Sequence, residues 1–309
     1  MTHNQLASKE QRQGVISAIS AYFLWGIAPI YFKLLDNIGA DEIMVHRVLW
    51  SCLLLLVIIV ITGKWRSLAL LIKNSPKLVF QLAVTALILG VNWFLFIWAI
   101  NNDHLLDASL GYYINPLLNV ALGMLFLHEK LSKWQLFAVL LAVIGVLIQV
   151  VILGSVPIIS LALAGTFGIY GLLRKKMAVD SFIGLLIESI LMLPIAAVYW
   201  WLFISSDTSN LFNNSMALNA GLILAGVVTT APLLCFTAAA KRLTLSTLGF
   251  FQYIGPSIMF LLATFYYQEP LSTAKIITFV FIWVALVIYS LDSFHNHKKK
   301  ARQLKPAIT

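Results

Sequence analysis

The sequence predicts an all-α membrane protein, with ten transmembrane helices arranged as two inverted five-helix repeats around a central cavity. Three observations predict this fold class: ten apolar runs of about 20 residues each, basic residues confined to alternate connections, and internal similarity between the two halves of the chain. The composition agrees, because 61% of the 309 residues are hydrophobic and only 11% are charged. So few charges cannot solvate the surface of a water-soluble protein of this length.

Each apolar run is long enough to cross a bilayer as an α-helix, since about 20 residues at a rise of about 1.5 Å span roughly 30 Å of hydrocarbon. The runs lack the alternating pattern of outer-membrane strands, and a helix satisfies its own backbone in lipid. The first run contains Trp25 and Pro29 and lacks an Ala-x-Ala-like cleavage site, so it is not interpreted as a signal peptide. The expected spans are 14–34, 43–62, 78–100, 105–127, 134–152, 156–174, 182–203, 218–240, 246–267 and 274–292.

The distribution of Lys and Arg predicts the orientation of these spans. All basic side chains except Lys33, Arg47 and Lys275 fall on one side of the membrane. Short cytoplasmic loops are enriched in Lys and Arg, so a multi-pass protein of the bacterial inner membrane with both termini in the cytoplasm is expected. The basic side chains on the cytoplasmic side are Lys9, Arg12, Lys64, Arg66, Lys73, Lys77, Lys130, Lys133, Arg174, Lys175, Lys176, Lys241, Arg242, Lys298, Lys299, Lys300, Arg302 and Lys305.

A proline and a glutamate recur at the same spacing in the two halves. Pro116 is followed by Glu129 near the end of the fourth span, and Pro256 is followed by Glu269 at the same point of the ninth. Both glutamates fall at the end of a span, where water is accessible. We therefore expect them to have a structural role rather than to bind a substrate.

Further segments of the two halves correspond, with small differences in offset. Residues 109–113 resemble 247–251, and 26–33 resemble 168–175, so the second copy gains two residues around Gln252 and Tyr253. Each copy holds five spans, and an odd number inverts the second copy relative to the first, as in many secondary transporters. The expected organisation is a cytoplasmic leader at 1–13, a first repeat at 14–152, a second repeat at 156–292 and a basic cytoplasmic tail at 293–309.

Several of these segments carry a family resemblance. Through Ala21-Tyr-Phe-Leu-Trp-Gly, the segments 42–51, 109–116 and 246–256, and the repeated proline and glutamate, the chain resembles EamA-type drug/metabolite transporters. Within that superfamily it is most similar to the RarD-type members. The resemblance implies a ten-helix bundle with a central cavity and a transporter that exports amino acids, other metabolites or drugs. The inverted repeat itself favours alternating access.

Two ionisable side chains inside the spans are the first candidates for transport. Arg47 in the second span and Glu188 in the seventh occupy nearly equivalent positions of the inverted halves. A charge at a helix centre costs about 2.5–3.5 kcal/mol on insertion scales, so each needs a reason. We expect Arg47 to attract an anionic or carboxylate group and Glu188 to bind a proton or a cationic group. Alternatively, Arg47 reaches the membrane surface or pairs with Asp41 or Glu42, and Glu188 pairs with the basic segment 174–176.

His46 is a further candidate for proton coupling because its ordinary pKa lies near neutral pH. It is adjacent to Arg47 and therefore about 100° round the helix from it. The alternative is a local hydrogen bond to a neighbour such as Glu42.

Polar and aromatic side chains near helix-breaking residues are expected to line the substrate pathway. Prolines free backbone carbonyls there, and amides and aromatic rings offer hydrogen bonds and apolar faces. The same amides could instead bind neighbouring helices and serve packing. With Arg47 and Glu188, the candidate substrate-binding residues are Tyr22, Trp25, Asn92, Trp93, Tyr112, Asn115, Gln252 and Tyr253.

Other functional classes lack their sequence signatures. No phosphate-binding Gly-x-x-x-x-Gly-Lys-Ser/Thr loop is present, so transport is expected to use gradients rather than ATP. No metalloprotease or nucleophile-elbow motif is present, so the chain is not expected to be an enzyme, and an integral-membrane enzyme or scaffold is the alternative. Cys52 and Cys235 have no ligand partners nearby, so neither a metal nor another cofactor is expected. The expected partners are a small-molecule substrate and the lipid bilayer, not nucleic acid, and a homodimer is left open.

Overall fold

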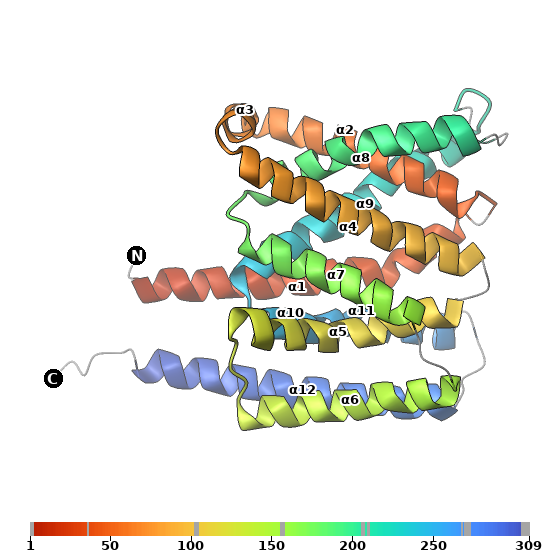
Figure 1. Ribbon diagram of the computed structural model, residues 1–309. Coiled ribbons are helices and arrows are strands. Elements are labelled where there is room, and N and C mark those ends of the chain that lie inside the picture. The colour runs from red at the N-terminus through yellow and green to blue at the C-terminus, as the bar shows by residue number, and fades with distance from the viewer. Residues whose placement is uncertain are drawn as a thin grey trace.

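The computed structural model describes residues 3–303, apart from 36, 102–104, 155–157, 205–207, 209–210, 267 and 269–272. Within these residues the protein is a bundle of helices without β-strands, which confirms the all-α class (Figure 1). The helices are α1 (His3–Lys33), α2 (Ala40–Ile61), α3 (Trp65–Asn74), α4 (Pro76–Asn101), α5 (Leu105–Leu127), α6 (Lys133–Leu153), α7 (Ile158–Lys176), α8 (Ser181–Phe203), α9 (Met216–Arg242), α10 (Leu245–Gln252), α11 (Ile254–Leu261), the π-helix η2 (Leu262–Tyr266) and α12 (Thr273–Gln303).

The described residues contain enough long apolar helices for several membrane crossings. Nine stretches are able to cross a bilayer by length and composition, and Gly111–Leu127 of α5 is a shorter apolar helix. The chain is therefore a multi-pass membrane protein. The count of ten crossings and the inverted arrangement of the halves remain predictions.

Polar side chains cap the starts of several helices. The Ser132 hydroxyl accepts a hydrogen bond from the Gln135 backbone N–H, and the Gln135 side chain accepts one from the Ser132 backbone N–H. Ser215 and Thr244 each accept a hydrogen bond from the backbone N–H three residues later. Asp180 caps α8 in a similar way. These caps explain why each capped helix begins close to the first residue of an apolar run.

Three polar segments outside the expected spans are helical. The expected leader is part of α1 from His3 onward, and the tail continues α12 to Gln303. Both segments are rich in residues with high helix propensity, which extend a helix already held by its apolar part. The third is α3, in the basic connection between the second and third expected spans.

The ninth expected span, 246–267, is not one continuous helix. It consists of α10, α11 and η2, with a turn at Tyr253. Pro256 consequently lies in the first turn of α11, where its missing N–H removes no helical hydrogen bond. Pro116, which the repeat pattern pairs with Pro256, lies inside the continuous helix α5. The interruption falls where the sequence comparison located two extra residues.

Helix α9 lies in the middle of the bundle and contacts α1, α2, α7 and α8. It packs closely on α2 where Gly226 contacts Trp50: a Cβ atom at residue 226 would lie 2.6 Å from the Trp50 carbonyl carbon. Glycine is therefore required at this crossing.

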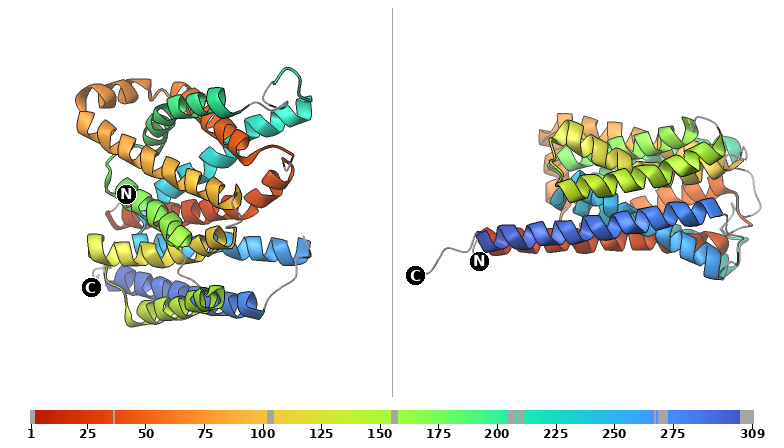
Figure 2. Two further views of the ribbon diagram at one scale, coloured as in Figure 1. Left: turned by 45° about the vertical axis from the view of Figure 1, so that its right-hand side comes forward. Right: turned by 90° about the horizontal axis from the view of Figure 1, so that it is seen from below.

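The remaining helices are arranged around this centre. Helix α2 also packs on α8, α4 on α7 and α8, and α5 on α7 and α10, while α1 contacts α11. Helices α6 and α12 pack against each other at one edge (Figures 1 and 2). The start of α1, the end of α12 and helix α3 lie at the same end of the bundle (Figure 1).

Candidate substrate site

A small cavity lies among α2, α4, α8 and α9. Its wall is mostly apolar, carries one carboxylate and several hydroxyl groups, and leaves room for water-sized molecules. This combination of an apolar wall and a few convergent polar groups resembles that of a small-molecule site, but in this conformation the cavity holds no more than water. The lining residues are Val48, Ser51, Leu55, Leu89, Trp93, Leu185, Glu188, Ser189, Met192, Thr229, Thr230 and Leu233.

Arg47 of α2 adjoins this cavity through two of the lining residues. Its Nε donates a hydrogen bond of 2.8 Å to the Thr229 hydroxyl, and its guanidinium carbon lies 5.0 Å from the centre of the Trp93 ring and 5.8 Å from that of Phe32. Among the described residues no carboxylate pairs with Arg47. The cation is thus held by a hydroxyl and aromatic faces, while its two terminal amino groups keep their donors for another acceptor.

Glu188 of α8 is buried, and its carboxylate has partners from two other helices. Thr85 of α4 donates a hydrogen bond of 2.6 Å to Oε1, and the Tyr170 hydroxyl of α7 lies 3.4 Å from Oε2. Arg174 Nη1 lies 3.7 Å from Oε1, and the two side chains are 1% and 2% exposed. The pairing of Glu188 with the segment 174–176, kept above as an alternative, is therefore present in this conformation.

Arg174 is a functional candidate that the sequence did not indicate. From the sequence it is the last residue of the expected span 156–174 and is counted with the basic residues of the cytoplasmic side. In the structure α7 continues to Lys176, and the Arg174 guanidinium packs against Gly184, where a side chain would collide with it. Its Nε, Nη1 and Nη2 make no hydrogen bonds. Tyr170 also lies beside the guanidinium. The buried cation is thus balanced mainly by Glu188.

His46 is completely buried, and its partner is not the expected Glu42. Its Nδ1 accepts a hydrogen bond of 3.1 Å from Trp50 Nε1, and its ring meets the Trp200 ring edge to face at 5.1 Å. Nε2 has no hydrogen-bond partner. A neutral imidazole with its proton on Nε2 fits this arrangement.

The three candidate amides hydrogen-bond to neighbouring helices. Asn92 donates to the Leu163 carbonyl at 2.9 Å and to a hydroxyl of α7. Asn115 donates to a carbonyl of α7 at 3.0 Å, and Asn119 donates to both Asn115 and Gln252 at 3.1 and 2.9 Å. These bonds join α4, α5, α7 and α10, which is the packing role left open from the sequence.

The aromatic candidates are spread over different surroundings. Tyr22 and Trp25 belong to a cluster of rings with Phe236, with centroids 5.6 to 6.4 Å apart, and the Tyr22 hydroxyl is buried without a partner. Tyr253 is buried and donates to a carbonyl of α5 at 3.3 Å. Tyr112 is 42% exposed, and its ring meets the Phe96 ring edge to face at 6.1 Å. Of the predicted residues, Trp93, Glu188 and, through its contacts, Arg47 thus lie at the cavity.

Glu129 holds the start of α10. Its carboxylate accepts hydrogen bonds from the backbone N–H groups of Leu245 and Ser246 at 2.6 and 2.9 Å and from the Ser246 hydroxyl at 2.7 Å. Negative charge at a helix N-terminus is favourable, which is the structural role expected for this motif. Glu269 lies outside the described residues.

A family model, several known protein sequences and a known crystal structure are all similar to this chain. A family model described as the EamA-like transporter family matches residues 12–151. Protein RarD of Escherichia coli (strain K12) is 53% identical over 295 residues, which cover 96% of this chain and 99% of that protein. An uncharacterized transporter of Vibrio cholerae serotype O1 is 58% identical over 284 residues, covering 92% and 94%. One chain of known crystal structure has a TM-score of 0.71 at 16% identity, covering 90% of this chain and 97% of that chain, which is a likeness of fold alone.

Proposed function

This chain belongs to the EamA-like transporter family as a RarD-type member, and from that premise we propose that it carries a small metabolite or drug across the membrane by gradient-driven alternating access. The family description and the relatives' names are those of transporters rather than enzymes. The direction we propose is export, as the sequence resemblance implies.

The pairing of the helices supports two interchangeable halves. If the halves are repeats, the helices of the first half correspond in order to those of the second: α1, α2, α4, α5 and α6 to α7, α8, α9, α10–η2 and α12. Exchanging the halves then converts the contact between α1 and α9 into the contact between α7 and α4. It likewise converts the contact between α2 and α9 into the contact between α8 and α4, and all four contacts are present. Three further contacts each join two corresponding helices and are therefore unchanged by the exchange: α2 with α8, α5 with α10, and α6 with α12. His128 and Gln268, which directly precede the two repeated glutamates, share a φ of 53°, a value uncommon outside glycine. Inverted halves related by a pseudo-twofold axis are common among transporters that work by alternating access, so these correspondences support the proposal.

One observation supports the choice of substrate: a carboxylate lines the cavity, and a cation contacts two of the other lining residues. Arg47 has no acidic partner in the described part of the chain and adjoins the cavity through Trp93 and Thr229, whereas Glu188 lines its wall. A carboxylate of the substrate would pair with the guanidinium fork, and a cationic group would pair with Glu188. In the present conformation Arg174 supplies that cation. The site therefore favours a zwitterion, such as an amino acid, or an analogue with both groups.

The same carboxylate supplies a coupling mechanism. A proton and the cationic group of the substrate compete for Glu188, because the protonated carboxyl no longer attracts a cation. On the side with the higher proton concentration, protonation releases the substrate, and on the other side deprotonation allows it to bind. An inward proton gradient then drives export without a further energy source.

Flux through reconstituted vesicles tests this function. Wild type and variants would be supplied with labelled zwitterionic amino acids, and with matched monocarboxylates and amines that lack one of the two groups. We expect Arg47→Ala to lower flux of carboxylate-bearing compounds by about 10- to 100-fold, the worth of a charged hydrogen bond. Glu188→Gln should abolish the response to a pH gradient but retain downhill exchange.

The matched control is Arg66→Ala, which removes an exposed arginine that does not line the cavity and should leave flux unchanged. Unchanged flux in both Arg47→Ala and Glu188→Gln would overturn the assignment of the site. Recovery of a chemically altered compound would indicate an enzyme instead.

A further inference from the structure

Helix α3 is too short to cross a bilayer. It joins α2 and α4, which are both long enough to span, and its 10 residues cover only about 15 Å. In Figure 1 it is seen close to along its axis, whereas α2 and α4 run across the view. The helix is therefore steeply inclined to the bundle, at the end where α1 starts and α12 ends.

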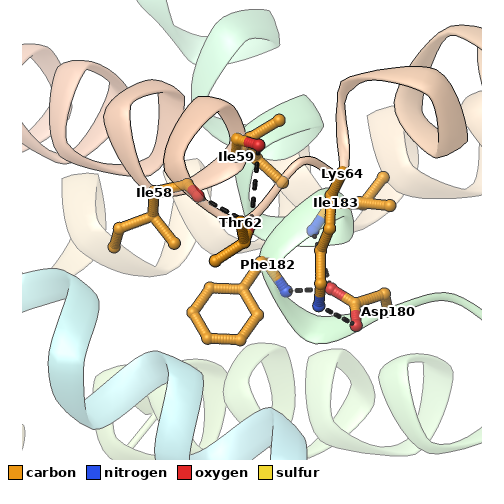
Figure 3. Close-up of polar contacts among 7 residues, drawn as sticks. All are labelled: Ile58, Ile59, Thr62, Lys64, Asp180, Phe182 and Ile183. Atoms are coloured by element: carbon orange, nitrogen blue, oxygen red, sulfur yellow. Dashed lines mark hydrogen bonds and ion pairs between the residues drawn. The ribbon is translucent and has the colours of Figure 1, made fainter.

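Local contacts fix which face of α3 is turned to the bundle. Gly63, with a φ of 66°, ends the turn after α2, and Lys64 Nζ pairs with Asp180 at the start of α8 at 2.7 Å (Figure 3). Lys64 also lies 4.7 Å from the centre of the Phe182 ring. Leu68 is 4% exposed and belongs to the main hydrophobic core. The helix consequently cannot turn its outer face inward.

That outer face carries an apolar stripe beside a basic stripe. Trp65 and Ile72, two helical turns apart, are 56% and 51% exposed. Arg66 and Lys73 follow each of them by one residue and are also exposed. Residues two turns apart lie nearly in line on a helix, so the two stripes run side by side, about 100° apart. A short helix with this pattern is typical of the membrane interface.

The charge of this region fits one kind of partner. Lys77 adds a further exposed cation at the start of α4, and no Asp or Glu occurs anywhere between residues 43 and 102. We propose that α3 is a membrane-surface helix that binds the headgroups of anionic phospholipids, with Trp65 and Ile72 at the acyl boundary and Arg66 and Lys73 on the phosphates. The binding is independent of the proposed transport site.

Fluorescence quenching by brominated lipids tests this proposal in the full-length protein. Wild type and Trp65→Phe are reconstituted with brominated phosphatidylglycerol or brominated phosphatidylcholine at equal mole fraction, and the difference between the two proteins isolates Trp65 among the nine tryptophans. We expect stronger quenching of Trp65 by the anionic lipid, weakened by salt. Because each surface cation favours anionic lipid by about fivefold, Arg66→Gln with Lys73→Gln should lower the association constant by about 25-fold.

Two further variants make the outcome decisive. Lys9→Gln with Arg12→Gln removes the same charge from α1 and should preserve the preference, while Arg66→Lys with Lys73→Arg should retain it by charge alone. Equal quenching by the two lipids, no Trp65 contribution, or an equal loss in the α1 control would overturn the proposal. Normal thermal unfolding of each variant excludes misfolding as the cause.

Discussion

The buried pair Arg174–Glu188 allows structure and transport to be separated by mutation. Glu188→Gln leaves the arginine charge without its main counter-charge, and Arg174→Gln leaves the carboxylate with only the hydroxyls of Thr85 and Tyr170. The double variant removes both charges and keeps the approximate side-chain size. We predict that each single variant is destabilised and that the double variant recovers most of the lost stability.

The geometry gives the size of this effect. Arg174 Nη1 and Glu188 Oε1 are 3.7 Å apart, and at an effective dielectric constant of about 20 unit charges at this separation attract by roughly 4 kcal/mol. Removing one member of a buried pair typically costs about 3–5 kcal/mol, whereas replacing both members is often neutral. If each single variant loses about 3–5 kcal/mol and the double variant is close to wild type, the double-mutant cycle gives a coupling energy of about 6–10 kcal/mol.

The assay combines unfolding in mixed micelles, followed by circular dichroism during titration with sodium dodecyl sulfate, with flux in vesicles normalised to folded protein. The double variant should approach wild-type stability yet remain without response to a pH gradient, because it still lacks the carboxylate. Additive losses in the cycle, or a stable Glu188→Gln single variant, would refute the electrostatic reasoning. Gradient-driven flux in the double variant would refute the coupling role.

Three further predictions concern stability. Gly226→Ala should lower the free energy of unfolding by about 1–3 kcal/mol, because the added methyl group forces α9 away from α2. The control Gly165→Ala has open space around its Cβ and should be neutral or stabilising by up to about 1 kcal/mol. Equal unfolding midpoints of the two variants would contradict the close approach of α9 to α2. Glu129→Gln should cost about 1–3 kcal/mol, measured in the same titration, because α10 loses a charged acceptor; an unchanged midpoint would count against this cap. Burial by itself would raise the pKa of the Asp180 carboxyl, but hydrogen bonds from Lys64 and the α8 backbone lower it below its ordinary value. The resulting stability is present above pH about 4 and is lost as pH falls through the lower folded pKa, so Asp180→Asn should flatten the acid side of a stability–pH curve; an unaltered acid limb would argue against this linkage.

The length of the apolar runs was enough to predict where most helices lie, because helix is the common way to satisfy a backbone in lipid. It was not enough for α3, whose ten residues are too few to stand out as a span and whose apolar positions are interleaved with Arg66 and Lys73. The break at Tyr253 was indicated by the two-residue difference between the halves, and a local difference is that Gly255 precedes Pro256 whereas Asn115 precedes Pro116.

The candidate site was predicted in part. Charges stood out because they are rare in spans, which identified Arg47 and Glu188. Arg174 was hidden among three consecutive basic residues, and the space for it depends on Gly184, which comes close only in three dimensions. The role of amides such as Asn92 could not be predicted from the sequence, because an amide that lines a pathway and an amide that joins two helices occur in the same kind of apolar segment.

Because α6 and α12 lie at the edge of the bundle, they are poor targets for changing the selectivity of the protein. These helices pack mainly on each other, and none of their described side chains lines the cavity. Libraries intended to change which compound is carried should therefore vary α2, α4, α8 and α9. Substitutions in α6 and α12 would alter yield, detergent tolerance or preferred bilayer thickness while leaving selectivity as it was.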